Sequence, residues 1–262
     1  MNRTEHVRLE QWTVKDYEEL APPHSLIPFV DRFWHGFVST ASPFRDLTIV
    51  PDGCVDVVYE QQGPYVRCFV FGTASHLHQF QFTPDAQYVG IRFRPGMGRH
   101  FLELHPRDLT DQHVEVSAFL GVQPDEIAEE SWFFAQTELL AHRLEVALHR
   151  LDVTPSPLEQ ALHRVQQNQE RWRVDTLADL TGHSVRQVER TIMADTGLPP
   201  KFLLRILRVQ SAIAAIQCAP LRSLVDLATT LDYADQAHMN RDFRLITGST
   251  PAQYQLALAS KG

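Results

Sequence analysis

The sequence predicts an α+β protein with a β-rich N-terminal part, flanked by helices, and an all-helical C-terminal part. Short β-branched runs separated by turn residues fill much of the first hundred residues, whereas apolar residues three and four apart recur through the last hundred. Between them, Pro155 and Pro157 favour an extended connection over a continued helix. We therefore expect an N-terminal domain over residues 1–152, a linker over 153–157 and a helical domain over 158–262.

Composition supports a folded chain and argues against several classes of protein. The 262 residues are 44% hydrophobic, which is enough for a packed core. No run reaches the roughly 18 uncharged apolar residues of a membrane span, and the start is too polar for a signal peptide, so we expect a cytoplasmic protein with no membrane partner. Cys54, Cys68 and Cys218 form no CxxC pair, which argues against a disulfide framework or a cysteine zinc site. We expect no cofactor.

The predicted strands lie in a core over about residues 14–120. Five β-rich runs are spaced as in an antiparallel sheet that rolls into a sandwich or barrel. They cover residues 47–50, 54–59, 65–71, 79–82 and 88–93. Pro51, Asp52 and Gly53 form a turn signal between the first two runs, because proline fixes φ and glycine tolerates positive φ.

Helical segments follow the last strand. Residues 97–104 fit a short helix, and residues 125–151 fit one or two longer helices. The latter segment contains an apolar stripe spaced by 4, 3 and 4 residues, formed by Leu140, Leu144, Ala147 and Leu151. The stripe is shorter than the three or four heptads of a convincing coiled coil, so two interpretations stay open: a helix that forms a homodimer, and a helix that packs on its own domain.

The last hundred residues contain an internal repeat with an offset of 51 residues. Each copy has a capping residue, an apolar residue four positions later, an arginine at six, an apolar residue at eight and a glycine at thirteen. The matched pairs are Ser184 and Asp235, Val188 and Met239, Arg190 and Arg241, Ile192 and Phe243, and Gly197 and Gly248. The plan is that of a helix with an N-terminal cap, one buried face and a left-handed glycine at its end.

A shorter helix precedes each copy. We expect Asp175 to cap a helix over 176–180, and a second short helix over 221–231. Each pair of helices with its short turn has the helix-turn-helix form, whose second helix enters the major groove of DNA. A long amphipathic helix joins the two units, starting after Pro199 and Pro200 and carrying an apolar face formed by Phe202, Ile206, Val209, Ile213 and Ile216. Two units in tandem favour double-stranded DNA as a partner over a plain helical bundle.

The formal charge of −8 does not oppose this interpretation once it is resolved by domain. Residues 156–262 hold 12 Lys+Arg and 10 Asp+Glu, hence 12 − 10 = +2. The remainder holds 24 − 12 = 12 basic and 32 − 10 = 22 acidic residues, hence −10. The excess acid therefore belongs to the N-terminal part, although a charge of +2 predicts weak non-specific affinity for DNA.

Residues from about 158 to 255 resemble the AraC-type DNA-binding domain. The residues that carry the resemblance are Leu177, Ala178, Ser184, Val188, Arg190, Gly197, Arg208, Ala212, Phe243, Arg244, Gly248, Ser249, Thr250, Pro251 and Tyr254. The chain departs from the family where Asp232 and Tyr233 replace a Gly-Phe pair, and at Ala237, Met239 and Ile192. The resemblance implies a transcription regulator in which two helix-turn-helix units read successive segments of the major groove.

The residues that would face the bases lie early in the second helix of each unit. They are Arg186, Gln187, Glu189 and Arg190 in the first unit, and Gln236, Ala237, His238, Asn240 and Arg241 in the second. Arginine suits guanine, glutamine and asparagine suit adenine, and glutamate accepts from cytosine. The alternative for the two arginines is an ion pair within the domain, for example with Asp179. Phosphate or solvent contacts are expected for Lys201, Arg205, Arg208 and Arg244.

The N-terminal part resembles a sensor domain found in a subgroup of these regulators. The residues that carry this resemblance cover 26–34, 51–56, 71–73 and 88–96. The resemblance implies a cupin-like β-roll with a regulatory role. A small-molecule effector would meet Phe33, Trp34, Arg92, Phe93 and Arg94, although pairing of the arginines with carboxylates and packing of the rings in the core compete with that role.

His76 and His78 are the only metal-ligand pattern that the N-terminal part offers. Their i, i+2 spacing would place both rings on one face of a strand, but no third ligand follows at a short distance, so loop histidines without a metal are favoured.

We therefore expect a sequence-specific regulator, not an enzyme, whose N-terminal domain responds to an effector or partner. Two alternatives are a cupin-like metal-dependent enzyme with an appended helical domain, and a constitutive DNA binder whose first domain only dimerises. RNA polymerase is a further partner if the protein activates transcription.

Overall fold

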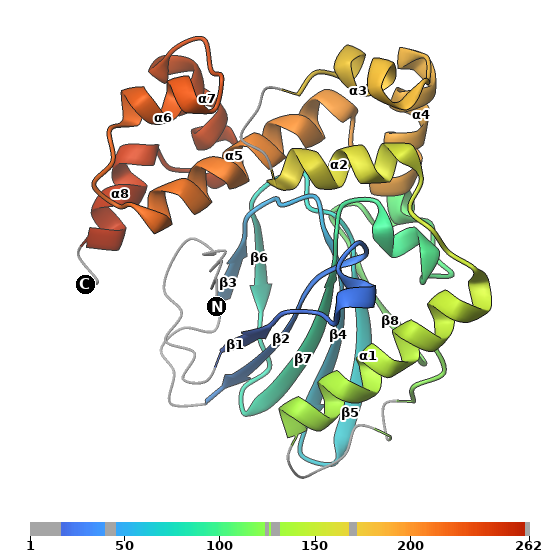
Figure 1. Cartoon of the computed structure of the whole chain (residues 1–262). Coiled ribbons are helices and arrows are strands. Elements are labelled where there is room, and N and C mark those ends of the chain that lie inside the picture. Colours follow the sequence, from blue (N-terminus) through green and yellow to red (C-terminus); the bar gives the residue numbers. More distant parts are fainter. Residues whose placement is uncertain (1–16, 40–45, 124–125, 127–131, 168–171, 260–262) are drawn as a thin grey trace.

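Two β-sheets and a helical C-terminal domain build the protein (Figure 1). The computed structural model describes residues 17–39, 46–123, 126, 132–167 and 172–259. Within them the predicted α+β class and the order of a β-rich domain followed by a helical one are confirmed.

The larger sheet has six antiparallel strands in the order β1-β2-β7-β4-β5-β8. In that order they span Glu18–Leu20, Val30–Val38, Ala86–Phe93, Val55–Gln62, Tyr65–Phe71 and His113–Val116. The smaller sheet pairs β3 (Asp46–Ile49) with β6 (His78–Gln81). The five predicted strands are present, but β1, β2 and β8 were not predicted.

The described residues include the short 3-10 helices η1 (His24–Leu26), η2 (Met97–His100) and η3 (Pro106–Leu109). The predicted helix over 97–104 is therefore η2, which ends four residues early. Helix α1 covers Trp132–Leu151, and the predicted start of this helical segment at residue 125 lies outside the described residues.

Both faces of the larger sheet are covered, because neighbouring residues of a strand point to opposite sides. Phe33, Val57 and Ile91 pack on the side of α1, whereas Trp34 and Val58 face the other side. On α1, the predicted stripe formed by Leu140, Leu144 and Ala147 is buried in the first of these cores, and its last member Leu151 is exposed. The stripe therefore serves its own domain.

The C-terminal domain consists of seven helices in the described residues. They are α2 (Pro157–Gln167), α3 (Val174–Thr181), α4 (Val185–Thr196), α5 (Pro200–Cys218), α6 (Leu224–Thr230), α7 (Gln236–Thr247) and α8 (Pro251–Ala259). Helix α5 runs between the pair α3–α4 and the pair α6–α7 (Figure 1). One apolar core, which includes Leu177, Val188, Ile213, Met239 and Phe243, joins both pairs to α5.

The predicted caps of the two second helices are present. Ser184 and Gln187 form a capping box at α4, and the carboxylate of Asp235 accepts the backbone N–H of His238 at α7. Gly197 and Gly248 end these helices in the left-handed conformation.

Both first helices begin elsewhere than predicted. Helix α3 starts at Val174 after Arg173, so Asp175 lies within its first turn and is not its cap. Helix α6 starts at Leu224 because the hydroxyl of Ser223 accepts the backbone N–H of Asp226. Asp232, predicted to tolerate a left-handed turn, has φ 53° between α6 and α7.

Candidate functional site

The first candidate site is the exposed face of α4. Arg186, Glu189 and Arg190 are exposed, whereas Val188 and Ile192 are buried beneath them. The side-chain oxygen of Gln187 accepts from the backbone and hydroxyl of Ser184 at 2.8 Å, so this residue holds the helix start as well as facing outward. The face therefore presents two arginines and one glutamate on a rigid helix start.

The equivalent face of α7 is less open. Ala237 and Arg241 are exposed, but Gln236, His238 and Asn240 are half-buried. Two of these three are turned inward. The His238 ring packs edge-on against Tyr233, and the side-chain oxygen of Asn240 is buried without a hydrogen-bond partner in the described chain.

The four predicted phosphate contacts divide into two classes. Lys201 and Arg244 are exposed. Arg205 instead pairs with Asp242 of α7 at 3.2 Å, and the Arg208 guanidinium lies 5.0 Å from the centre of the Tyr233 ring. These two arginines therefore tie α5 to the second unit, and sequence reasoning missed Asp242 because nothing in the pattern marks it as buried.

The other end of α4 is fastened to the N-terminal domain. Arg99 of η2 lies 3.3 Å from Asp195 of α4 and 3.0 Å from Glu159 of α2, and His100 lies 2.7 Å from Glu159. Burial alone would raise the pKa of Glu159, but hydrogen bonds from His100, Ser156 and Arg99 lower it to about 2. Burial raises the pKa of Asp195 to about 6, although Arg99 opposes the shift.

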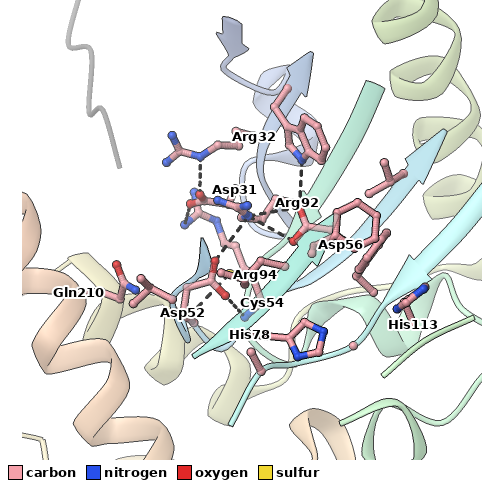
Figure 2. A pocket seen from close by; sticks show the side chains of 18 of the residues that line it. Asp31, Arg32, Asp52, Cys54, Asp56, His78, Arg92, Arg94, His113 and Gln210 are labelled. Carbon is pink, nitrogen blue, oxygen red and sulfur yellow. Dashed lines mark hydrogen bonds and ion pairs between the residues drawn. The ribbon is translucent and has the colours of Figure 1, made fainter. Parts of the chain in front are cut away.

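The second candidate site is a cavity of about 460 Å³ between the two domains (Figure 2). Strand register arranges its sheet side in rows: Asp56, Arg92 and Arg32 lie in the row next to the helical domain, and Val58, Gly90 and Trp34 lie in the row below. The helical domain contributes Gln166 from α2 and a row on α5 that consists of Leu207, Gln210, Ser211 and Ala214. Helix α5, which carries both helix-turn-helix units, therefore forms part of the cavity wall.

The arginines in the cavity are paired with carboxylates. Arg92 lies 3.3 Å from Asp56 and 3.6 Å from Asp52, and Arg94 lies 3.1 Å from Asp31 (Figure 2). Burial alone would lower the pKa of Arg92, but Asp56 and Asp52 raise it well above its ordinary value. Arg94 also donates to the side-chain oxygen of Gln166 at 3.1 Å, a direct link between the domains.

Three of the five residues predicted to meet an effector line this cavity: Trp34, Arg92 and Arg94. Phe33 and Phe93 do not, because each precedes one of these residues along the chain and points to the opposite face, into the core with α1.

His76 and His78 do not share a strand face, because β6 begins only at His78. His78 lines the cavity, whereas exposed His76 lies in the preceding turn, 3.3 Å from Asp111, and the two rings are 6.3 Å apart. Over the described residues, no cluster of three His, Cys, Asp or Glu side chains has the arrangement of a metal site. No described helix combines the length and apolar character needed to cross a bilayer.

Comparison with known families matches both domains. Residues 177–257 match a family described as a helix-turn-helix domain, and residues 18–115 match a domain of unknown function, DUF6597. No curated protein sequence matches the chain.

Several solved structures are similar to the chain. The DNA-binding domain of AdpA, a global transcriptional factor in complex with a target DNA, is 25% identical over 41% of this chain and 96% of its own, with a TM-score of 0.37. ToxT from Vibrio cholerae O395 is 10% identical over 86% of this chain and 98% of its own, with a TM-score of 0.45. ToxT from Vibrio cholerae strain SCE256, bound to an unsaturated fatty acid, is 9% identical over 92% and 94%, with a TM-score of 0.40.

Proposed function

We propose that this chain is a DNA-binding transcription regulator whose AraC-type helix-turn-helix domain reads the operator through α4 and α7, under control of a small molecule in the interdomain cavity. The observation that carries the proposal is the position of α5, which holds both units and also lines the cavity. A cytoplasmic location and, for an activator, contact with RNA polymerase follow from this role.

Arg186, Glu189 and Arg190 are proposed to contact bases from α4, with Arg241 as their counterpart on α7. Each is exposed, and an arginine that binds guanine through two hydrogen bonds contributes about 1–3 kcal/mol of discrimination. The half-buried Gln236, His238 and Asn240 would need a change of rotamer to reach a base, so the second unit is proposed to read fewer positions directly.

The DNA-reading proposal is tested with the full chain on an operator found by genome-wide selection of bound DNA. Arg190→Ala and Arg241→Ala should each weaken operator binding by about 5-fold to 150-fold and relax the preference at one base position. Arg150→Ala, which removes an exposed charge at the end of α1, is the matched control. Full affinity and selectivity in both variants would show that these helices do not face the bases.

Control through the cavity has its own test. Ala214 of α5 lines the cavity, so Ala214→Phe fills space that a ligand would occupy without touching either recognition helix. We expect a several-fold change in operator affinity, because the new side chain alters how the N-terminal domain rests on α5. The control Ala135→Phe places the same ring on the exposed face of α1.

The constitutive alternative, in which the N-terminal domain only dimerises, predicts that Ala214→Phe and Ala135→Phe bind the operator alike. The enzyme alternative, a cupin-like metal catalyst, is not favoured by the positions of His76 and His78; a single tightly held metal ion in the purified protein would favour it.

A further inference from the structure

The interdomain cavity has a chemical character that narrows the class of its ligand, and this inference rests on the effector control proposed above. Its deeper wall is aromatic. Phe80 packs edge-on against Phe71 and Phe82, with ring centres 5.0 and 5.3 Å apart, and Phe82 packs against Tyr88 at 4.7 Å. With Trp34, these rings offer an apolar body both dispersion contacts and the negative faces of aromatic rings.

At the charged end of the cavity, two carboxylates are more exposed than the arginines. The side chains of Asp52 and Asp111 are 26% and 27% exposed, whereas those of Arg92 and Arg94 are 6% and 13% exposed. A ligand can therefore reach these two carboxylates more readily than either guanidinium group.

The arginines that line the cavity already have carboxylate partners. Arg92 pairs with Asp56 and Asp52, and Arg94 shares Asp31 with Arg32, which also pairs with Glu19. An anionic ligand would place a further negative charge beside these half-buried carboxylates, which is unfavourable in a site of this burial. A cation would instead add a partner to carboxylates that keep unused lone pairs.

The residues of α5 that line the cavity also offer hydrogen-bond acceptors to a ligand. One N–H of the Gln210 amide donates to the backbone oxygen of Pro51 at 2.7 Å, and its side-chain oxygen remains an acceptor for a ligand. The hydroxyl of Ser211 donates to Leu207 at 3.0 Å, so its lone pairs remain as acceptors. Figure 2 shows Gln210 of α5 beside Asp52.

We propose that the cavity binds an organic cation: a protonated amine carried on an aromatic or similarly bulky apolar body. The amine lies between Asp52 and Gln210 and so bridges the N-terminal domain to α5, while the apolar body lies against Phe71, Phe80 and Trp34. Because the head group touches α5 itself, binding of this cation fixes the N-terminal domain against the helix that carries both DNA-reading units.

The test uses three probes of one shape: 4-phenylbutylamine, 4-phenylbutyrate and 4-phenylbutan-1-ol. Calorimetric titration into the full chain should give an amine affinity at least tenfold higher than that of the carboxylate, with the alcohol between them. Binding should also raise the melting temperature, because a ligand that binds only the folded state stabilises it.

Asp52→Asn separates charge from structure. Asparagine keeps the side-chain oxygen that accepts the backbone N–H of Cys54 at 2.9 Å, so the turn is retained. We expect this variant to lose at least fivefold in amine affinity with little change for the alcohol. Asp108→Asn, which neutralises a carboxylate exposed on η3, should leave all three affinities unchanged.

Three results would overturn the proposal: equal or tighter binding of the carboxylate, amine binding that Asp52→Asn does not weaken, or no amine binding up to millimolar concentration. None of these removes the cavity's control of DNA binding, because the Ala214→Phe experiment measures that control without any ligand. Conversely, an amine that binds while Ala214→Phe leaves operator affinity unchanged would support the site and refute its regulatory role.

Discussion

The two helix-turn-helix units share one plan but differ in what holds them. The first unit is fastened to the N-terminal domain, where Asp195 pairs with Arg99 and a side chain at Gly197 would meet Thr110. The second unit is fastened to α5, through Arg205 with Asp242, and approaches the N-terminal domain where Gly248 lies near Leu77. The first unit is thus held by the N-terminal domain and the second by α5.

This difference predicts unequal roles. A change in the N-terminal domain reaches α4 directly through η2 and η3, whereas it reaches α7 mainly through α5. We therefore expect the position of the first unit to depend more on the conformation of the N-terminal domain. The second unit should keep its position on α5.

The largest expected effect compares the two terminal glycines. Both have left-handed φ, 70° and 75°, so alanine costs about 1–2 kcal/mol of strain at either site. At Gly197 the new Cβ would lie 1.9 Å from the hydroxyl of Thr110, whereas at Gly248 it would lie 2.8 Å from a flexible leucine tip. Gly197→Ala should lower the free energy of unfolding by about 2–4 kcal/mol and Gly248→Ala by about 1–2 kcal/mol. Urea unfolding of the full chain measures both variants. Equal losses of unfolding free energy would show that the N-terminal domain does not pack tightly against the end of α4.

Next in size is the loss of the buried carboxylate at the interface. Glu159→Gln removes the charge that His100, Arg99 and the backbone of Ser156 all contact, and should cost about 2 kcal/mol. The exposed Glu138→Gln on α1 is the matched control. If Glu159→Gln were as stable as Glu138→Gln, the ion pairs and hydrogen bonds of the Glu159 carboxylate would make no net contribution to stability.

A smaller effect should appear as a pH dependence. Asp195 has a raised pKa of about 6, so its protonated form favours folding, and its contribution is largest below its ordinary pKa near 3.8 and lost as pH rises through about 6. For Glu159 the pKa is lowered, so its ionised form favours folding. With a pKa of about 2, this contribution to stability is lost only below about pH 4.5. Between pH 7 and 4.5 the wild type should therefore gain about 1–2 kcal/mol relative to Asp195→Asn. Parallel unfolding curves for the two proteins across this range would contradict the shift.

The smallest effect concerns the second unit alone. Asp242→Asn weakens the bond from Arg205, which is partly exposed, so we expect a loss of about 1 kcal/mol in stability. Selection of bound DNA should show a relaxed preference in the half of the operator that α7 reads and an unchanged preference in the other half. Relaxation across both halves would show that the two units do not orient independently.

The helical domain could be predicted well because its signals are local. Ser184 and Asp235 cap the helices that follow them, and the 51-residue repeat marks both units along the chain without reference to any tertiary contact. The DNA-facing residues stay predictions; Arg190 and Arg241 are exposed on their helices.

The N-terminal domain was harder because its sheet is covered on both faces. Strand β2 places Asp31, Arg32 and His35 among buried aromatic residues, so it lacks the clean alternation that marks a strand. Phe33 and Phe93 were grouped with Trp34, Arg92 and Arg94 although neighbouring residues of a strand point to opposite faces. Asp31 and Asp52 were missed as partners of the arginines because that pairing depends on how distant segments lie side by side, which no local pattern reveals.

The close packing of Trp34 has an optical consequence. Its indole lies over Gly90, where any side chain would come within 2.1 Å of the ring, and its N–H donates to Asp56 at 2.9 Å inside the cavity wall. The chain has four tryptophans, and this one is held rigidly between a carboxylate and the cavity. Its fluorescence emission is therefore a built-in reporter of cavity occupancy, which Trp34→Phe would remove.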